Sequence, residues 1–185
     1  TRSYMRKLTI EEMNRISVEE FHKCSKLPLI IVLDNVRSVY NIGSVFRTAD
    51  AFRIEEIVLC GICACPPSAE IHKTALGAED SVKWTYCKDT LEAVHELRDR
   101  HYQIVAVEQV EGSTLLNEWK PDRDNKYALI LGNEVKGVRQ DVVDLCDDCL
   151  EIPQYGTKHS LNVSCTASIV MWDFFQSFQN HTELS

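Results

Sequence analysis

Short apolar runs alternate with amphipathic stretches along the chain, and this alternation predicts strands and helices in turn. The predicted strands cover residues 28–33, 56–60, 82–87, 103–108, 127–132 and 150–152. The predicted helices cover residues 41–52, 90–100 and 161–180, with a helical turn at 71–75. Several of the strands are continuously apolar, as expected where a parallel strand is covered on both faces. The pattern therefore predicts an α/β fold in which a parallel sheet is flanked by helices.

The last predicted helix carries its apolar residues at helical spacing, so that they fall on one face. These residues are Val163, Ala167, Val170, Met171, Phe174 and Phe178. Ser160, Asn162 and Ser164 stand at its start, where free N–H groups and the helix dipole favour polar or anionic ligands. The simpler alternative is that Ser160 is only the N-cap of the helix.

The first 26 residues predict a helical extension, and residues 27–185 predict the main domain. Two capping-box patterns, Thr9 to Glu12 and Ser17 to Glu20, indicate two short helices. The same segment carries much local positive charge, on Arg2, Arg6, Lys7, Arg15, Lys23 and Lys26. This charge is typical either of a solvated face or of an arm that contacts RNA.

Composition narrows the class of protein. A chain of 185 residues with 44% hydrophobic residues suits one domain with a substantial core. No apolar run approaches the ~18 residues of a membrane span, and the polar N-terminus shows no signal peptide, so a cytoplasmic location is expected. The net charge of −8 argues against wide, non-specific binding of nucleic acid, although a local RNA site remains compatible with it.

Five of the eight cysteines fall in two groups, Cys60, Cys63 and Cys65, and Cys146 and Cys149. Such spacings can bind zinc, but no histidine stands at ligand spacing beside them, which favours buried free thiols. No carboxylate cluster suits magnesium, so we expect no metal. The seven glycines form no G-x-G pattern, and no P-loop follows any of them, which excludes the common nucleotide-binding fingerprints.

Three segments, each after a predicted strand, carry the strongest signal. They are NIGSVFRTA at 41–49, GNEVKG at 132–137, and IPQYGTKHSLNVS at 152–164. In this order they resemble the three motifs of the SpoU (TrmH) family, over roughly residues 27–180. That family comprises S-adenosylmethionine-dependent RNA ribose 2′-O-methyltransferases of the SPOUT superfamily.

The resemblance implies a SPOUT-type deep C-terminal trefoil knot, in which the last helix, residues 161–180, is threaded through a loop and forms the cofactor pocket. It implies S-adenosylmethionine as cofactor, bound by backbone groups at Gly132, Ile152 and Leu161, with the loop after Val107 as a third wall. It also implies a homodimer whose active site takes residues from both subunits. The last helix has more aromatic residues than one covered face needs, which favours this dimer: Trp172, Phe174, Phe175 and Phe178. The start of the predicted helix 41–52 is expected to share the interface.

Arg47 matches the family's catalytic arginine. Because the pKa of a guanidinium exceeds ~12, we favour a clamp on the target phosphate and the developing 2′-oxyanion over a general base. Asn41 is expected to fix the loop or the ribose. Glu134 would contact the cofactor or order Arg47, unless it is a solvated carboxylate.

Ser160 and Asn162 complete the candidate site, because they offer a hydroxyl and an amide for the ribose and for the cofactor's carboxylate. The favoured function is methyl transfer to a ribose 2′-hydroxyl of tRNA or rRNA. Two alternatives remain: methylation of an RNA base, and a non-catalytic RNA-binding or assembly protein with the same fold. The combination of Arg47 and the SLNVS motif favours ribose.

Overall fold

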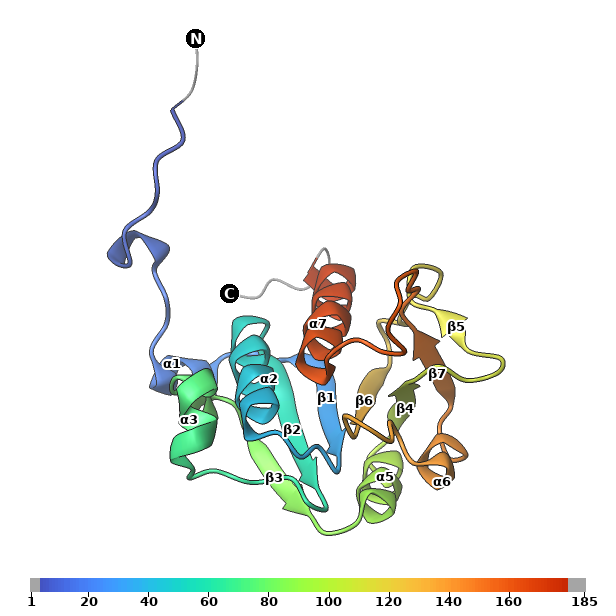
Figure 1. Ribbon diagram of the computed structural model, residues 1–185. Helices are drawn as coiled ribbons and strands as arrows, with labels where there is room; N and C mark the ends of the chain where they lie inside the picture. The colour runs from blue at the N-terminus through green and yellow to red at the C-terminus, as the bar shows by residue number, and fades with distance from the viewer. Residues whose placement is uncertain (1–3, 180–185) are drawn as a thin grey trace.

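The computed structural model describes residues 4–179 and contains one seven-stranded sheet in which every strand pair is parallel (Figure 1). The strands are β1 Leu27–Asp34, β2 Ile54–Cys60, β3 Trp84–Cys87, β4 Tyr102–Val107, β5 Thr114–Leu115, β6 Lys126–Gly132 and β7 Asp148–Glu151. Their order across the sheet is β3-β2-β1-β6-β4-β7-β5. The α/β fold with a parallel sheet is therefore confirmed.

Helices cover both faces of the sheet (Figure 1). They are α1 Val18–Lys23, α2 Val39–Ala51, α3 Ala69–Ala75, α4 Ala78–Ser81, α5 Thr90–Asp99, α6 Gln140–Val143 and α7 Val163–Gln179, and a 3-10 helix, η1 Glu11–Met13, precedes them. Helices α2, α3 and α7 pack on one face, and α5 and α6 pack on the other. Two hydrophobic layers therefore sandwich the strands, as a parallel sheet requires.

Strand β1 shows why the apolar runs form central strands. Leu29, Ile31 and Leu33 pack into the layer beneath α2 and α7. Ile30 and Val32, which alternate with them, pack into the layer beneath α5. Because successive side chains of a strand point to opposite faces, only a continuous apolar run satisfies both layers.

Helix α7 buries the whole predicted apolar face, from Val163 to Phe178. Its first residue is Val163, and its N-cap is Asn162, whose Oδ1 accepts hydrogen bonds from the amides of Ser164 (2.9 Å) and Cys165 (3.3 Å). The interpretation of Ser160 as the N-cap is therefore wrong, because asparagine is among the best N-cap residues and lies nearer the helix. Residue 180, the predicted helix end, lies outside the described residues.

Helices α2 and α7 lie side by side and run in the same direction. Asn41 contacts Asn162 near their starts, and the hydroxyls of Thr48 and Ser168 are 3.1 Å apart one to two turns later. Each helix follows a strand of the parallel sheet, so both N-termini lie at the edge where the strands end. Two helix dipoles thus present their positive ends to the same region.

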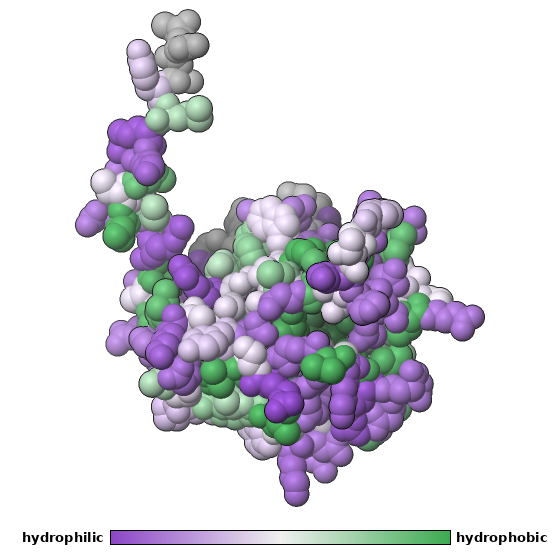
Figure 2. Space-filling model, viewed as in Figure 1, coloured by the Kyte–Doolittle hydropathy of each residue, from purple (hydrophilic) through white to green (hydrophobic). Residues whose placement is uncertain are grey.

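The N-terminal segment is helical only in part. Ser17 and Glu20 form the predicted capping box at the start of α1, and Phe21 of α1 is buried in the core. Thr9 and Glu12 also bond each other reciprocally, but they hold only the short η1. Residues 4–16, which precede the N-cap of α1, extend away from the body in Figures 1 and 2. The boundary at residue 26 stays a prediction.

Three of the shortest elements, of two to four residues each, are not evident from the residue pattern. These are α4, α6 and β5, and none is long enough to show a helical or strand period. The knot implied by the resemblance stays a prediction. No helix within residues 4–179 is long and apolar enough to cross a membrane.

Candidate functional site

A cavity of about 710 Å³ opens at the edge of the sheet where β4, β6 and β7 end. Its walls are residues 107–110, 131–138, 150–152 and 159–163, with further contacts from α6 and the first turn of α7. Three walls are thus segments at or just after strand ends, and the fourth is the start of a helix. This edge is where ligands bind in open parallel sheets.

The four predicted cofactor contacts all line this cavity. They are Val107, Gly132, Ile152 and Leu161. Gly132 has a clear steric reason, because a Cβ there would lie 2.1 Å from the carbonyl carbon of Gly137. The loop 133–138 thus turns back directly over the end of β6. The role of these residues in holding a cofactor stays a prediction.

Glu134 ties this loop to the start of α2. Its carboxylate accepts hydrogen bonds from the backbone amides of Arg37 (3.0 Å) and Ser38 (2.9 Å) and from the side-chain amide of Asn41 (3.3 Å). Partial burial opposes ionisation, but these donors outweigh it and hold the pKa of Glu134 below its ordinary value. A carboxylate at a helix N-terminus also benefits from the helix dipole.

Asn41 and Asn162 complete a chain of contacts at the cavity. The side-chain amide of Asn162 donates to Oδ1 of Asn41 at 3.2 Å, while Oδ1 of Asn162 caps α7. Glu134, Ser160 and Asn162 line the cavity. The structure therefore brings four of the five predicted catalytic residues together, Ser160 through the shared cavity wall and the others through hydrogen bonds.

Arg47 is the exception. It is exposed on α2, does not line the cavity, and forms no hydrogen bond or ion pair with any residue the structure describes. Glu134 bonds the start of α2 instead, so the expectation that it orders Arg47 is wrong within one subunit. The cause is geometric, since Asn41 faces α7 and Arg47, six residues later, lies about 120° around the helix.

Two residues at the end of β4 were missed by the sequence analysis. Glu108 accepts hydrogen bonds from the amides of Val138 (2.9 Å) and Gln109 (2.9 Å), and it thereby holds the far end of the loop 133–138. The side chain of Gln109 donates to the carbonyl of His159 at 2.7 Å, which joins two walls. Their position directly after a buried strand was the available signal, because strand ends carry ligand sites in such sheets.

All eight cysteines are free thiols. Burial raises the pKa of Cys63 to about 11 and that of Cys146 to about 12, which keeps both protonated near neutral pH. Cys63 also accepts a hydrogen bond from the amide of Val36. Among residues 4–179, no group of three His, Cys, Asp or Glu side chains is placed to hold a metal ion.

Glu134→Gln is expected to lower the free energy of unfolding by about 1 kcal/mol at neutral pH, because it removes charge from several hydrogen bonds. The folded-state pKa of Glu134 lies below its ordinary 4.5. The carboxylate's contribution is therefore complete above pH 4.5 and is lost as the pH falls through the lowered pKa. Urea unfolding of both proteins between neutral and acid pH measures this, and the difference should shrink at low pH.

The matched control is Glu111→Gln, at an exposed glutamate whose side chain forms no hydrogen bond with the described residues. It should change the unfolding free energy little at any pH. Equal effects of the two substitutions would show that Glu134 does not hold the loop.

The arrangement suits a polar ligand of moderate size. The cavity lies within the usual ~300–1,000 Å³ range of small-molecule sites, and much of its wall is loop, whose backbone carries donor and acceptor groups. Such groups read the edge of a heterocycle without added charge, while the start of α7 favours a carboxylate.

Comparison with known proteins agrees with this geometry. The model of the SpoU rRNA Methylase family matches residues 28–172. The chain is 32% identical to the 23S rRNA (guanosine-2'-O-)-methyltransferase RlmB of Nitrosomonas europaea over 84% of its own length. It spans 57% of that relative, and about three fifths of the curated relatives it matches.

Solved structures show the same fold. A TrmH/SpoU tRNA modifying enzyme of A. aeolicus superposes with a TM-score of 0.77 at 24% identity, over 88% of this chain and 81% of that one. The SpoU methyltransferase AviRb of Streptomyces viridochromogenes, solved with AdoMet, gives 0.75 at 20% identity, over 87% and 64%. The family match covers most of the chain, and so the chain belongs to the SpoU rRNA Methylase family.

Proposed function

We propose that this protein transfers a methyl group from S-adenosylmethionine to a ribose 2′-hydroxyl of tRNA or rRNA. The observation that carries the proposal is the junction of Glu134, Asn41 and Asn162 beside a cavity lined by all four predicted cofactor contacts. The curated relative named for guanosine 2′-O-methylation of 23S rRNA supports the acceptor. The AdoMet complex of AviRb, which shares the fold, supports the cofactor.

The cofactor supplies an electrophilic methyl group. Backbone groups at Gly132, Ile152 and Leu161 would hold the cofactor, and the loop after Val107 would close the other side. Ser160 and Asn162 offer their polar groups to its carboxylate and to the target ribose. The reaction breaks the S–CH₃ bond and forms an O–CH₃ bond, and the hydroxyl proton leaves to solvent, so positioning and charge stabilisation are the protein's contributions.

Arg47 acts on the cavity of a second subunit. The side chain is exposed and unpaired within residues 4–179, and it lies outside the cavity of its own chain. A guanidinium supplied by a partner clamps the target phosphate and the developing oxyanion together, since its planar fork reaches two oxygens. The active unit is therefore a homodimer.

An aromatic patch marks the surface for this dimer. Phe52, Trp172 and Phe175 lie with ring centroids 5.1–5.8 Å apart where α7 passes the end of α2, and Ile169 is exposed one turn earlier. Trp172 leaves 47% of its surface exposed. Apolar groups gathered this way on a surface mark an interface. This patch lies at the end of α2, whereas the sequence favoured its start.

Methyl incorporation from labelled S-adenosylmethionine into bulk RNA tests the function, together with calorimetry of cofactor binding in the presence of a chelator. A ribose 2′-O-methyl product blocks alkaline cleavage of the following phosphodiester. Product that remains cleavable at the modified nucleotide would identify a base as the acceptor. Cofactor binding without methylation of any RNA would favour the non-catalytic alternative.

Trp172→Glu is expected to convert the dimer to a monomer, because it places a charge in the apolar patch. Light scattering at micromolar concentration measures the mass. The control is Tyr86→Glu, exposed to a similar degree (49%) on the edge strand β3, which should leave the dimer intact. A monomeric wild-type protein would contradict the proposed assembly.

A cytoplasmic location stays a prediction of the sequence.

A further inference from the structure

Asp34 is a buried carboxylate that no step of the proposed reaction uses. It is the last residue of β1, at the edge of the sheet that carries the cavity, and it is 0% exposed. It does not line the cavity. A charge in such a place is costly unless every oxygen is satisfied, so its partners indicate its purpose.

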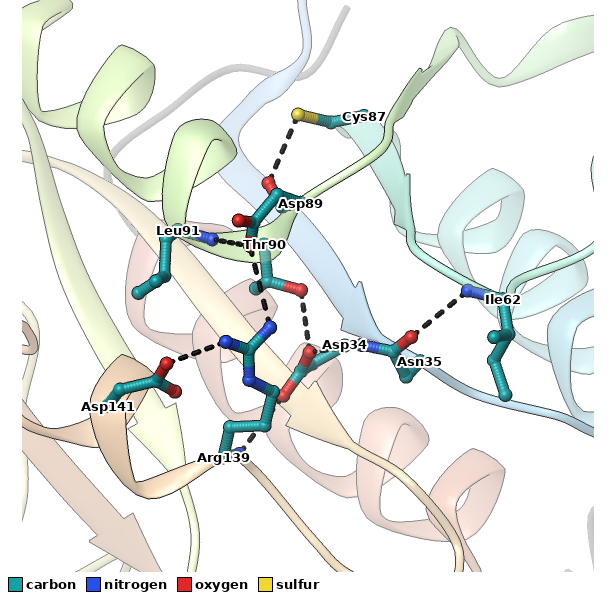
Figure 3. Close-up of polar contacts among 9 residues, drawn as sticks. All are labelled: Asp34, Asn35, Ile62, Cys87, Asp89, Thr90, Leu91, Arg139 and Asp141. Carbon is teal, nitrogen blue, oxygen red and sulfur yellow. Dashed lines mark hydrogen bonds and ion pairs between the residues drawn. The ribbon is translucent and has the colours of Figure 1, made fainter.

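Both oxygens of Asp34 accept hydrogen bonds from different segments (Figure 3). Oδ1 receives the hydroxyl of Thr90 at 2.6 Å and the side-chain amide of Asn35 at 2.9 Å. Oδ2 receives the backbone amide of Arg139 at 3.1 Å. The carboxylate therefore joins the end of β1, the start of α5 and the residue that follows the loop 133–138.

These contacts reach both ends of the loop. At the far end of the loop, Asp34 accepts the backbone amide of Arg139 directly. The guanidinium of Arg139 is also bound by Asp89 and Asp141 (Figure 3). At the near end Asp34 fixes Asn35, whose carbonyl accepts the side-chain amide of Asn133 at 2.8 Å. Oδ1 of Asn133 in turn accepts the amides of residues 135 and 136.

We infer that Asp34 is a positioning residue that sets the shape of the cavity by holding both ends of the loop 133–138, and so tunes affinity for the ligand without touching it. Only the identity of that ligand, S-adenosylmethionine, rests on the proposed function. The loop supplies one wall of the cavity, which Ile152 and Leu161 also line, and Gly132 leaves it no free space over the strand end. Its two anchors therefore decide the width of the cavity.

The test uses Thr90→Val, which removes the hydroxyl donor to Asp34, and Thr90→Ser, which keeps it; Asp34→Asn is a second, stronger variant. Calorimetry at a temperature where all proteins are folded should show S-adenosylmethionine binding about tenfold more weakly for Thr90→Val, the effect of one lost hydrogen bond to a charged group. Thr90→Ser should bind like the wild type. Turnover at saturating cofactor should change little in either.

Hydrogen exchange of the amides of residues 135, 136 and 139 gives a readout that needs no ligand. These amides should exchange faster in Thr90→Val and Asp34→Asn. If the wild type fails to bind S-adenosylmethionine while this exchange still responds, the proposed function fails and the positioning role stands.

Glu56→Gln is the matched control, because Glu56 is also buried (2% exposed) and accepts a threonine hydroxyl, from Thr85 at 2.7 Å, but it lies in the first half of β2, away from the cavity. It should lower thermal stability without changing cofactor affinity or the exchange of the loop amides. Unchanged affinity and exchange in both Thr90→Val and Asp34→Asn would overturn the inference. So would an equal loss of affinity in Glu56→Gln.

Discussion

Arg47→Ala is expected to lower the rate of methyl transfer by about 100- to 1,000-fold, the usual loss when one preorganised charge-stabilising donor is removed. Cofactor affinity should stay nearly unchanged, because the proposed cofactor contacts are backbone groups at Gly132, Ile152 and Leu161, whereas Arg47 is proposed to act on the target phosphate and the developing oxyanion. Arg47→Lys should recover only part of the rate, since an ammonium lacks the planar fork that spans a phosphate and a ribose oxygen. Single-turnover methylation assays and calorimetry separate the two effects. Near-normal turnover of Arg47→Ala would make this arginine a surface residue without a role in catalysis.

Mixed dimers show which cavity Arg47 serves. One subunit carries Arg47→Ala with an intact cavity, and the other carries an intact Arg47 with a cavity disabled at Gly132. If Arg47 acts across the dimer, the mixed dimer has one intact site of two and regains activity that neither parent shows. If Arg47 acts within its own chain, both sites of the mixed dimer are defective and no activity returns.

Gly132→Ala is expected to remove measurable cofactor binding and to destabilise the fold by about 1–3 kcal/mol, the range for overpacking a closed site. The added Cβ would lie 2.1 Å from the carbonyl carbon of Gly137 and 2.2 Å from the amide nitrogen of Val138. These neighbours are backbone, so the loop itself must move, and with it one wall of the cavity. Calorimetry and urea unfolding measure both consequences.

Gly156→Ala is the control for this substitution, because a Cβ at Gly156 meets no atom within 4 Å. It also lies between the last strand and α7, so it tests whether any added methyl in this region disturbs binding. We expect its affinity and stability to match the wild type. Retained cofactor binding by Gly132→Ala would mean that the loop 133–138 moves to accommodate the added methyl group with little loss of free energy.

Long periodic helices and strands were predictable from the sequence, whereas the hydrogen bonds that join loops distant along the chain were not. The apolar face of α7 and the two-sided burial of β1 follow directly from residue spacing, and two of the three motifs, at 132–137 and 152–164, contain residues that line the cavity. Glu134 accepts hydrogen bonds from the backbone amides of Arg37 and Ser38. Because every residue except proline has such an amide, the sequence does not reveal these bonds. Asn162 and Ser160 are both acceptable caps two residues apart, so only the folded loop decides between them. The motif identifies Arg47 as a candidate site residue, but it does not indicate whether Arg47 faces the cavity of its own subunit or that of a partner subunit.

The order of the cavity walls along the chain has an evolutionary consequence. Among the described residues, every residue that lines the cavity comes at or after Val107, whereas Arg47 and the helix that carries it come from the first third. The part of the gene that encodes the walls can thus stay fixed while the exposed surface of α2 around Arg47 varies. Exchange of the exposed residues of α2 between relatives, with Asn41 and Thr90 kept, should redirect the choice of RNA and leave the affinity for the methyl donor almost untouched.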